Sequence, residues 1–307
     1  MTNQTSEFIL LGLSDLMYSQ IPLSLLILFV YMSTLAGNLL IISLVISDSH
    51  LQTPMYFFLG NLSALDIFTS SVSSFHLLFD IFRRSWLILY SSCIAQVFFF
   101  FCFAVTEAFL LAVMSYDRYV AICHPLHYTT MINIHLCIRL ASGVWAIGSI
   151  CSSVQTIFTL RLAFCGSTII PGLFCELYQL IQVSCSDTSL NHLLLYLHVV
   201  CFGIAAFLIT FLSYVYVFKT ILRIKMKDGK LKAFSTCSSH LTVVFIFYGT
   251  GAINYARPKN KPFLEVRMVS AVYVILTPFL NPAIYSLRNN EIKGAFCRAL
   301  ARVGFRP

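Results

Sequence analysis

Charged side chains are scarce in this sequence: only 10% of its 307 residues are Asp, Glu, Lys or Arg, whereas 58% are hydrophobic. This composition excludes an ordinary soluble globular protein. A helix that crosses a membrane needs about 20 apolar residues, and seven segments of the chain meet that requirement. They cover approximately residues 22–46, 55–79, 94–116, 140–160, 193–218, 233–256 and 268–287, and all but the second and third lack charged side chains altogether.

The alternating pattern of a membrane β-barrel is also absent. Lipid offers no hydrogen bonds to a polypeptide backbone, so spans without that pattern must be helices. The sequence therefore predicts an all-α membrane protein, a seven-transmembrane helix bundle in a single domain of residues 1–307. Within it we expect a terminal segment over 1–21, the bundle with its loops over 22–287, and a tail with a short amphipathic helix over 288–307.

Basic residues are missing from the first 21 residues, which contain Glu7 and Asp15. If the N-terminus is extracellular, 13 Lys and Arg residues lie on the inner side and 7 on the outer side. This asymmetry predicts a cytoplasmic C-terminus. The net charge of +8 then reflects topology and contact with membrane lipid rather than nucleic-acid binding. We expect no cleavable signal peptide, because the first apolar run, Phe8–Leu13, is too short.

The triplet Asn3-Gln4-Thr5 is a glycosylation sequon on the predicted outer side, so we expect a glycan on Asn3. A second sequon begins at Asn61 but falls within the second span, where glycosylation cannot reach it.

Four of the eleven cysteines fall on the predicted outer side: Cys93, Cys165, Cys175 and Cys185. An even number of cysteines in an oxidising compartment predicts two disulfides, for which three connectivities exist. A bond from the long loop of residues 161–192 to the third span would order that loop over the bundle. We interpret the other seven as small buried hydrophobic residues, with Cys297 a candidate for palmitoylation.

The segment Met114–Cys123, at the end of the third span, contains the triplet Asp117, Arg118 and Tyr119. Charged groups near hydrocarbon are costly and usually mark function. The triplet therefore indicates a conformational switch on the inner face of the membrane. The alternative is that these residues only anchor the helix at the interface.

Six short motifs occur in order along the chain: Gly37-Asn38, Leu51–Tyr56, Met114–Cys123, Ser213-Tyr214, Lys232–His240 and Pro278–Asn289. Each motif alone is weakly specific. The ordered set resembles the olfactory receptors, within the rhodopsin-like G-protein-coupled receptors, along nearly the whole chain, and the loop length is similar to that of the tetrapod-type (class II) branch. The chain departs from the family pattern in Ser71–Ser92 and Cys175–Leu180, which lack prolines common there.

The resemblance implies an odorant receptor, a multi-pass protein of the plasma membrane and not an enzyme. It implies that a small, mainly apolar odorant activates a heterotrimeric stimulatory G protein of the olfactory type and raises cyclic AMP. A receptor-trafficking protein is a candidate further partner, and no cofactor is expected apart from a sodium ion. The resemblance also implies the disulfide pairs Cys93–Cys175 and Cys165–Cys185.

The resemblance assigns switch roles to further residues. Arg118, restrained by Asp117 at rest, would be released to admit the G protein, with Tyr214 and Tyr285 settling around it. Pro282 interrupts the hydrogen bonding of the last helix and permits a bend that can repack. For each tyrosine, simple anchoring at the membrane interface is the alternative.

Asp66 and Glu107 are acids within hydrocarbon that face no basic partner in the sequence. Buried unpaired carboxylates tend to take up a proton or bind a cation. The resemblance places them beside Asn38 and Asn281, where a sodium ion or a proton would stabilise the resting state. The alternative is a protonated, hydrogen-bonded pair that serves packing only.

The third span carries one apolar face at i, i+3, i+4 and i+7, formed by Phe101, Ala104, Val105 and Ala108. The resemblance turns this face toward a ligand pocket shared with the fifth and sixth spans. That pocket would also include Phe100, His198, Phe202, Tyr248, Gly251, Ala252 and Tyr255. Lipid contact or helix packing is an alternative for any phenylalanine, and a structural hydrogen bond is one for His198.

Rival functions lack their signatures. An opsin requires a lysine in the last span, and residues 268–287 contain none. An amine receptor requires an acid near the outer end of the third span, and the resemblance places Phe100 at that position. A transporter would show internal repeats or interrupted polar helices. An enzyme would show a metal cluster, a nucleophile or a phosphate loop, and the sequence shows none of these.

Overall fold

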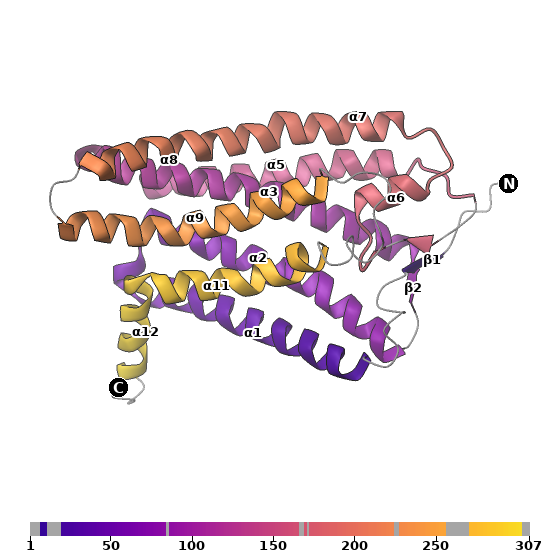
Figure 1. Cartoon of the computed structure of the whole chain (residues 1–307), viewed down its shortest axis with the longest axis horizontal. Helices are drawn as coiled ribbons and strands as arrows, with labels where there is room; N and C mark the ends of the chain where they lie inside the picture. The colour runs from indigo at the N-terminus through magenta and orange to yellow at the C-terminus, as the bar shows by residue number, and fades with distance from the viewer. Residues whose placement is uncertain are drawn as a thin grey trace.

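The computed structural model of the chain describes residues 7–10, 20–83, 86–165, 169–170, 172–223, 227–255 and 270–302. The long helices lie side by side along the longest axis of the molecule (Figure 1). Short strands gather at one end, near the N-terminus, and the last helix turns across the opposite end, near the C-terminus. We refer to these as the strand end and the α12 end.

The long helices are α1 (Gln20–Ser47), α2 (Pro54–Arg83), α3 (Tyr90–Cys123), α5 (Ile134–Thr159) and α9 (Lys227–Tyr255). A further helical run joins α7 (Ser189–His198), the π-helical turn η4 (Val199–Ile204) and α8 (Ala205–Arg223). Another joins the π-helical turn η5 (Val272–Leu276) to α11 (Thr277–Arg288). The short elements are η2 (Ser49–Leu51), η3 (Pro125–His127), α4 (Tyr128–Met131), α6 (Leu177–Val183) and α12 (Asn290–Arg302).

Within the described residues, five helices are long and apolar enough to cross a membrane: Pro22–Ser47, Pro54–Phe79, Tyr90–Cys123, Ile134–Thr159 and Ser189–Arg223. Two shorter apolar helices, Cys237–Ile253 and Val272–Ser286, occupy the positions of the sixth and seventh predicted spans. The prediction of a mainly helical protein with apolar helices of membrane length is confirmed. The count of seven spans stays a prediction.

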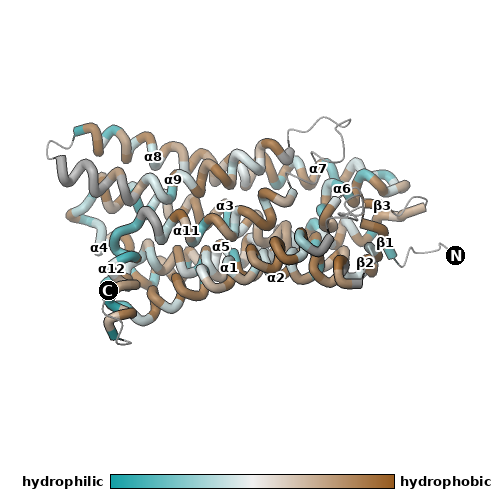
Figure 2. The backbone as a smooth tube through the Cα atoms, turned by 60° about the horizontal axis from the view of Figure 1, so that its bottom comes forward, coloured by the Kyte–Doolittle hydropathy of each residue, from teal (hydrophilic) through white to brown (hydrophobic). Residues whose placement is uncertain are grey.

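The outward faces of these helices are strongly apolar. Hydrophobic residues cover the shafts of the bundle, and hydrophilic residues gather toward the two ends (Figure 2). Side chains such as Phe29 (64% exposed), Ile46 (72%) and Phe245 (76%) point outward. Water would not tolerate so large an apolar surface, whereas hydrocarbon would.

The interior, by contrast, contains many polar side chains. Asn38, Asp66, Ser115 and Asn281 are each no more than 2% exposed. Several hydroxyl groups bond to the backbone of their own helix, as Ser115 does to the carbonyl of Leu111 at 2.8 Å. Such bonds satisfy polar groups locally and leave the helix faces free to pack.

A small sheet covers the strand end. Strand β1 (Glu7–Leu10) pairs antiparallel with β2 (Leu87–Leu89) and parallel with β3 (Ile169–Ile170). Phe8 and Leu10 point inward and are almost fully buried. The sheet joins the N-terminal segment to the connection after α2. The segment Ser71–Ser92, which lacks the proline common in the family, is therefore not all connection. Because no proline interrupts it, α2 continues to Arg83.

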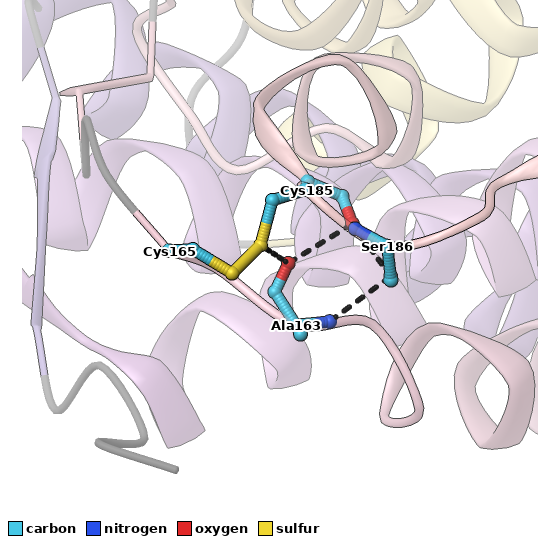
Figure 3. The surroundings of a disulfide bond; sticks show 5 residues. Ala163, Cys165, Cys185 and Ser186 are labelled. Carbon is cyan, nitrogen blue, oxygen red and sulfur yellow. Dashed lines mark hydrogen bonds between the residues drawn. A yellow bond between two sulfur atoms is a disulfide. The ribbon is translucent and has the colours of Figure 1, made fainter.

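Two disulfides hold the loop between α5 and α7. Cys93 of α3 is bonded to Cys175, and Cys165 is bonded to Cys185. Around the second bond, the amide of Cys185 donates to the carbonyl of Ala163 at 2.9 Å, and the amide of Ala163 donates to Ser186 Oγ at 3.1 Å (Figure 3). The pairing expected from the family resemblance is present.

At the α12 end, α12 is held against the turn between α1 and α2. The guanidinium of Arg298 donates from Nε to Asp48 Oδ2 at 2.8 Å. This hydrogen bond holds the pKa of Asp48 well below its usual range. Ile292 and Ala295 are buried on the inner face of α12, which gives the amphipathic helix expected in the tail.

Close approach of α5 to α3 depends on Gly148. A Cβ atom added there would lie 2.8 Å from the Cys102 carbonyl oxygen and closer still to Thr106 Oγ1, both on α3. Gly143, five residues earlier on the same helix, has no atom within 4 Å of an added Cβ. The two glycines therefore separate the effect of packing from the effect of helix propensity.

We predict that Gly148→Val destabilises the purified protein by about 1–3 kcal/mol through overpacking, whereas Gly143→Val changes stability little. Thermal unfolding in detergent, followed by the reactivity of buried cysteines, measures the difference. Equal unfolding temperatures for the two variants would contradict a close α3–α5 contact at Gly148.

Candidate functional site

A cavity of about 440 Å³ lies between α3, the α7–η4–α8 run, α9 and η5. Ten of the eleven residues expected to contact a ligand line it: Phe100, Phe101, Ala104, Val105, Ala108, His198, Phe202, Tyr248, Gly251 and Ala252. The eleventh, Tyr255, ends α9, and its side chain lies outside the described residues. The structure thus gathers around one space residues that are more than 150 positions apart along the chain, as Phe100 and Ala252 are.

The lining is apolar with a few polar groups. Phe101 meets the His198 ring edge to face, with 5.3 Å between ring centres, and Phe109 meets Phe202 in the same way at 6.1 Å. Tyr248 adds a buried hydroxyl beside Phe207. Such a space accepts a small apolar molecule that carries one or two polar atoms.

The two ring nitrogens of His198 have different roles. Its Nδ1 lies 2.7 Å from the carbonyl oxygen of Leu194 one helical turn earlier, so Nδ1 carries a proton and donates to that oxygen. In the neutral ring, Nε2 then remains as an acceptor. The structural bond expected as an alternative is therefore present, and it fixes the ring that lines the cavity.

The roof of the cavity comes from Glu176, Leu177 and Tyr178, which follow Cys175. The Cys93–Cys175 disulfide ties this segment to α3, and the Cys175 amide donates to Gln96 Oε1 at 3.0 Å. Sequence reasoning did not assign these three residues to the ligand site. The predicted tie between this loop and the third span was the signal that could have found them.

A second set of predicted residues lies deeper in the bundle. Asn281 Nδ2 donates to both carboxylate oxygens of Asp66, at 3.1 and 3.0 Å. Asp66 and Glu107 interact electrostatically. Asn38 donates to the carbonyls of Thr34 and Pro278, at 3.0 and 3.3 Å, and not to either acid.

Several acceptors in this deep set have no hydrogen-bond partner in the described part of the chain: Glu107 Oε1, Asn38 Oδ1 and Asn281 Oδ1. Oxygen atoms of carboxylates and amides are suitable ligands for a hard cation. No group of three or more His, Cys, Asp or Glu residues clusters in the described ranges. The residues present fit a sodium ion or a shared proton.

The switch residues lie toward the α12 end of α3. Arg118 donates from Nη2 and Nε to Asp117 Oδ2, at 2.9 and 3.2 Å. The other carboxylate oxygen of Asp117 accepts from the hydroxyl of Tyr128, in α4, at 2.8 Å. Tyr128 was not predicted, because no local pattern links it to Asp117 eleven residues earlier.

The remaining switch residues occupy different positions. The Tyr119 hydroxyl lies 3.0 Å from His124 Nε2 near the surface. Tyr214 and Tyr285 are 5% and 0% exposed, so they are buried in the bundle and not placed at a lipid interface. Tyr214 is hydrogen-bonded to His240 Nδ1 of α9, at 2.6 Å.

Pro282 lies inside α11 and packs closely against α1. A Cβ atom added to Gly37 would come within 3.1 Å of the Pro282 ring. The Gly37-Asn38 motif therefore serves two purposes, because Gly37 admits the proline ring and Asn38 donates to the nearby Pro278 carbonyl, four residues before Pro282.

Known proteins resemble this chain along nearly its full length. A sequence model of the olfactory receptor family matches residues 27–303. Olfactory receptor 5B12 of Homo sapiens is 44% identical over 307 residues, which cover 98% of this chain and 98% of the relative. Olfactory receptor 5G3 of Homo sapiens is 45% identical over 306 residues, 99% of this chain and 98% of the relative.

A mouse relative shows a similar degree of identity: Olfactory receptor 7A40 of Mus musculus is 46% identical over 300 residues, which cover 97% of each chain. Proteins of this kind are receptors and not enzymes. Sequence motifs, helical architecture and close relatives therefore agree, and the chain belongs to the olfactory receptor family.

Proposed function

We propose that this protein is an odorant receptor of the plasma membrane, with seven membrane-spanning helices. It binds small volatile molecules in the cavity between α3, the α7–η4–α8 run and α9. It then activates a stimulatory G protein of the olfactory type and raises cyclic AMP. The observation that carries the proposal is the apolar cavity of about 440 Å³ in a chain of this family.

The two ends of the bundle support an orientation. The Cys93–Cys175 disulfide lies at the strand end, in one buried cluster with Phe8 and Leu10 of β1, and disulfides form in oxidising compartments. The basic residues Lys293, Arg298 and Arg302 lie on α12 at the other end, as expected for a cytoplasmic side. The N-terminus is therefore extracellular, and the C-terminus is cytoplasmic.

The cavity favours ligands with an apolar body and a single polar group. His198 Nε2 offers that group an acceptor. A ligand of few atoms gains little free energy in total, at most about 1.5 kcal/mol for each non-hydrogen atom. Affinities are therefore modest, and small changes in cavity shape alter selectivity strongly.

The switch works by a shift between two populations. At rest Asp117 holds Arg118 and is itself held by Tyr128. An odorant that binds the active arrangement more tightly shifts the equilibrium toward it. Arg118 then becomes free to contact the G protein as α9 moves away from α8.

Arg118→Ala is expected to abolish the odorant-dependent rise in cyclic AMP, because the group that contacts the G protein is removed. Cyclic AMP is measured in cells screened with a broad panel of volatile odorants, at matched surface expression. Arg161→Ala, at an exposed arginine near the strand end, is the control and should respond as the wild type does. A normal response from the Arg118 variant would overturn the proposed switch.

Ala104→Phe is expected to fill part of the cavity and to raise the half-maximal odorant concentration by about tenfold or more, equivalent to about 1.4 kcal/mol. Bulky odorants should be affected more than compact ones. Ala146→Phe places the same ring on the outer surface of α5, away from the cavity, and should leave potency unchanged. Equal odorant potency in the wild type, Ala104→Phe and Ala146→Phe would mean that the odorant binds outside this cavity.

Glu107→Gln is expected to change basal cyclic AMP by about fivefold or more, within the range of typical coupling free energies. A rise in basal cyclic AMP, with loss of its sodium dependence, indicates a sodium ion that stabilises the resting state. A fall in basal cyclic AMP indicates that a proton on Glu107 stabilises the resting state, since Gln resembles the protonated acid. Glu291→Gln, on the exposed side of α12, is the control. Unchanged basal activity and unchanged sodium dependence would refute both versions.

A further inference from the structure

The ring of His198 is held in one orientation at the wall of the odorant cavity. Its Nδ1 lies 2.7 Å from the carbonyl oxygen of Leu194, one turn earlier in α7. The ring also meets Phe101 of α3 edge to face, and its centre lies 5.7 Å from the centre of the Phe202 ring. A rotation of the His198 ring would break the hydrogen bond and disturb both ring contacts, so its two nitrogens keep their positions.

This hydrogen bond also determines which nitrogen carries the proton. A carbonyl oxygen can only accept, so Nδ1 must carry the hydrogen that it donates. In the neutral ring, Nε2 is then an acceptor without a hydrogen atom of its own. Among the described residues Nε2 has no hydrogen-bond partner, and it is not one of the fully enclosed polar atoms. The cavity wall therefore presents an accessible acceptor that the protein does not use.

The other polar groups of the described lining are less selective. The Tyr248 hydroxyl is enclosed by the protein, and Glu176 and Tyr273 already interact with other groups. Tyr178 brings a hydroxyl to the roof. A phenol hydroxyl both donates and accepts, so it does not distinguish one class of polar ligand from another. Discrimination between ligand classes rests on His198 Nε2, which only accepts.

An acceptor in this position selects ligands by the hydrogen that they donate. An alcohol donates its hydroxyl hydrogen to Nε2. A ketone, aldehyde, ether or ester of the same skeleton has no such hydrogen, so the complex loses a hydrogen bond and leaves the nitrogen without a partner. A site that bonds a ligand hydroxyl therefore rejects an analogue without it more strongly than an apolar pocket rejects a small change in size.

The walls of the cavity carry small side chains farther from the strand end. Gly203 of η4 follows His198 by more than one helical turn in the direction of α8 (Figure 1). Gly251 of α9 and Ala104 and Ala108 of α3 line the same space. A Cβ atom added to Gly203 or Gly251 would meet no atom within 4 Å. A broad hydrocarbon body therefore fits there while its polar group lies at His198.

We propose that this receptor binds alcohols with a broad alicyclic body. The ligand hydroxyl donates to His198 Nε2, and the hydrocarbon skeleton occupies the space beside Gly203 and Gly251. The inference rests on the proposed odorant site between α3, the α7–η4–α8 run and α9. It adds the chemical class of the ligand and the residue that selects that class.

The test is direct binding to the purified receptor in lipid nanodiscs, measured as the rise in unfolding temperature with ligand concentration. Borneol and camphor share a bicyclic skeleton and differ as alcohol and ketone, and 2-nonanol and 2-nonanone form the matching linear pair. Each alcohol should bind about tenfold more tightly than its ketone. Ketones that bind as tightly as the alcohols, or no binding of either alcohol, would overturn the proposal. Bornylamine that binds more tightly than borneol would overturn it in favour of a cationic ligand held by Glu176.

His198→Phe tests the acceptor, because it keeps a ring against Phe101 and Phe202 and removes Nε2. Borneol affinity should fall about tenfold while camphor affinity stays the same, so that the preference disappears. His192→Phe, at an exposed histidine of α7 outside the lining, is the matched control and should keep the preference. A full preference for borneol in His198→Phe would exclude Nε2 as the acceptor.

His198→Gln decides the matter if His198→Phe does not fold. The amide of Gln both accepts and donates, so camphor should gain affinity and approach borneol. An unchanged ratio of the two affinities would again exclude the role of Nε2.

Gly251→Val tests the shape of the ligand body, because its side chain enters the space beside Gly203. Borneol affinity should fall about tenfold, within the usual cost of overpacking, whereas the slender 2-nonanol should lose less than about threefold. Gly249→Val, at an exposed glycine of the same helix outside the lining, is the control for the change in helix propensity. Equal losses for both alcohols in Gly251→Val would contradict a broad body at this place.

These binding measurements need no G protein, so the two proposals fail separately. Binding with the expected preference for alcohols, but without a cyclic AMP response in cells, would overturn the proposed coupling and leave the ligand class in place. A cyclic AMP response to ketones and alcohols alike would overturn the ligand class and leave the receptor function in place.

Discussion

Polar groups inside this bundle must find their partners within the protein, because the surrounding hydrocarbon offers none. The rest of the structure follows from this constraint. Apolar side chains face outward, where they gain little from association, so the helices are held by close packing and by internal hydrogen bonds. Gly148 and Gly37 permit that packing at two contacts, α5 with α3 and α1 with α11. The pairing of Asn281 with Asp66 supplies bonds across the interior. Within the described part of the bundle, several buried polar atoms have no protein partner, and Glu107 Oε1 is one of them.

The outer loop shows how one covalent tie arranges a site. Cys175 is fixed to α3 by its disulfide and by its amide bond to Gln96. The residues that follow, Glu176, Leu177 and Tyr178, therefore line the cavity between α3 and α9. The second disulfide, Cys165–Cys185, holds the outer part of the same loop (Figure 3). The β-sheet adds the N-terminal segment to this assembly through Phe8 and Leu10. The loop beside the cavity is therefore anchored at several points.

Sequence reasoning located what local patterns encode and missed what depends on contacts between distant segments. Apolar runs located the long helices, and the i, i+3, i+4 and i+7 rhythm correctly placed Phe101, Ala104, Val105 and Ala108 on one face. The remaining cavity residues and both disulfides came from the family resemblance. The strand at Glu7–Leu10 was missed, because four residues carry little signal until a partner strand is known. The roof residue Glu176 and the contact from Tyr128 to Asp117 were missed for the same reason.

The position of Arg118 limits how the proposed switch can work. Its ion-pair partner, Asp117, is the neighbouring residue on the same helix, so a rigid movement of α3 leaves that pair intact. A signal from the cavity must therefore act on contacts that join different elements. Two such contacts lie near Arg118: Tyr128 of α4 bonds to Asp117, and Tyr214 of α8 bonds to His240 of α9. The second one has to break if α9 moves away from α8. In the proposed switch, the hydrogen bond between Tyr214 and His240 and the one from Tyr128 to Asp117 therefore stabilise the resting state more directly than the ion pair itself does.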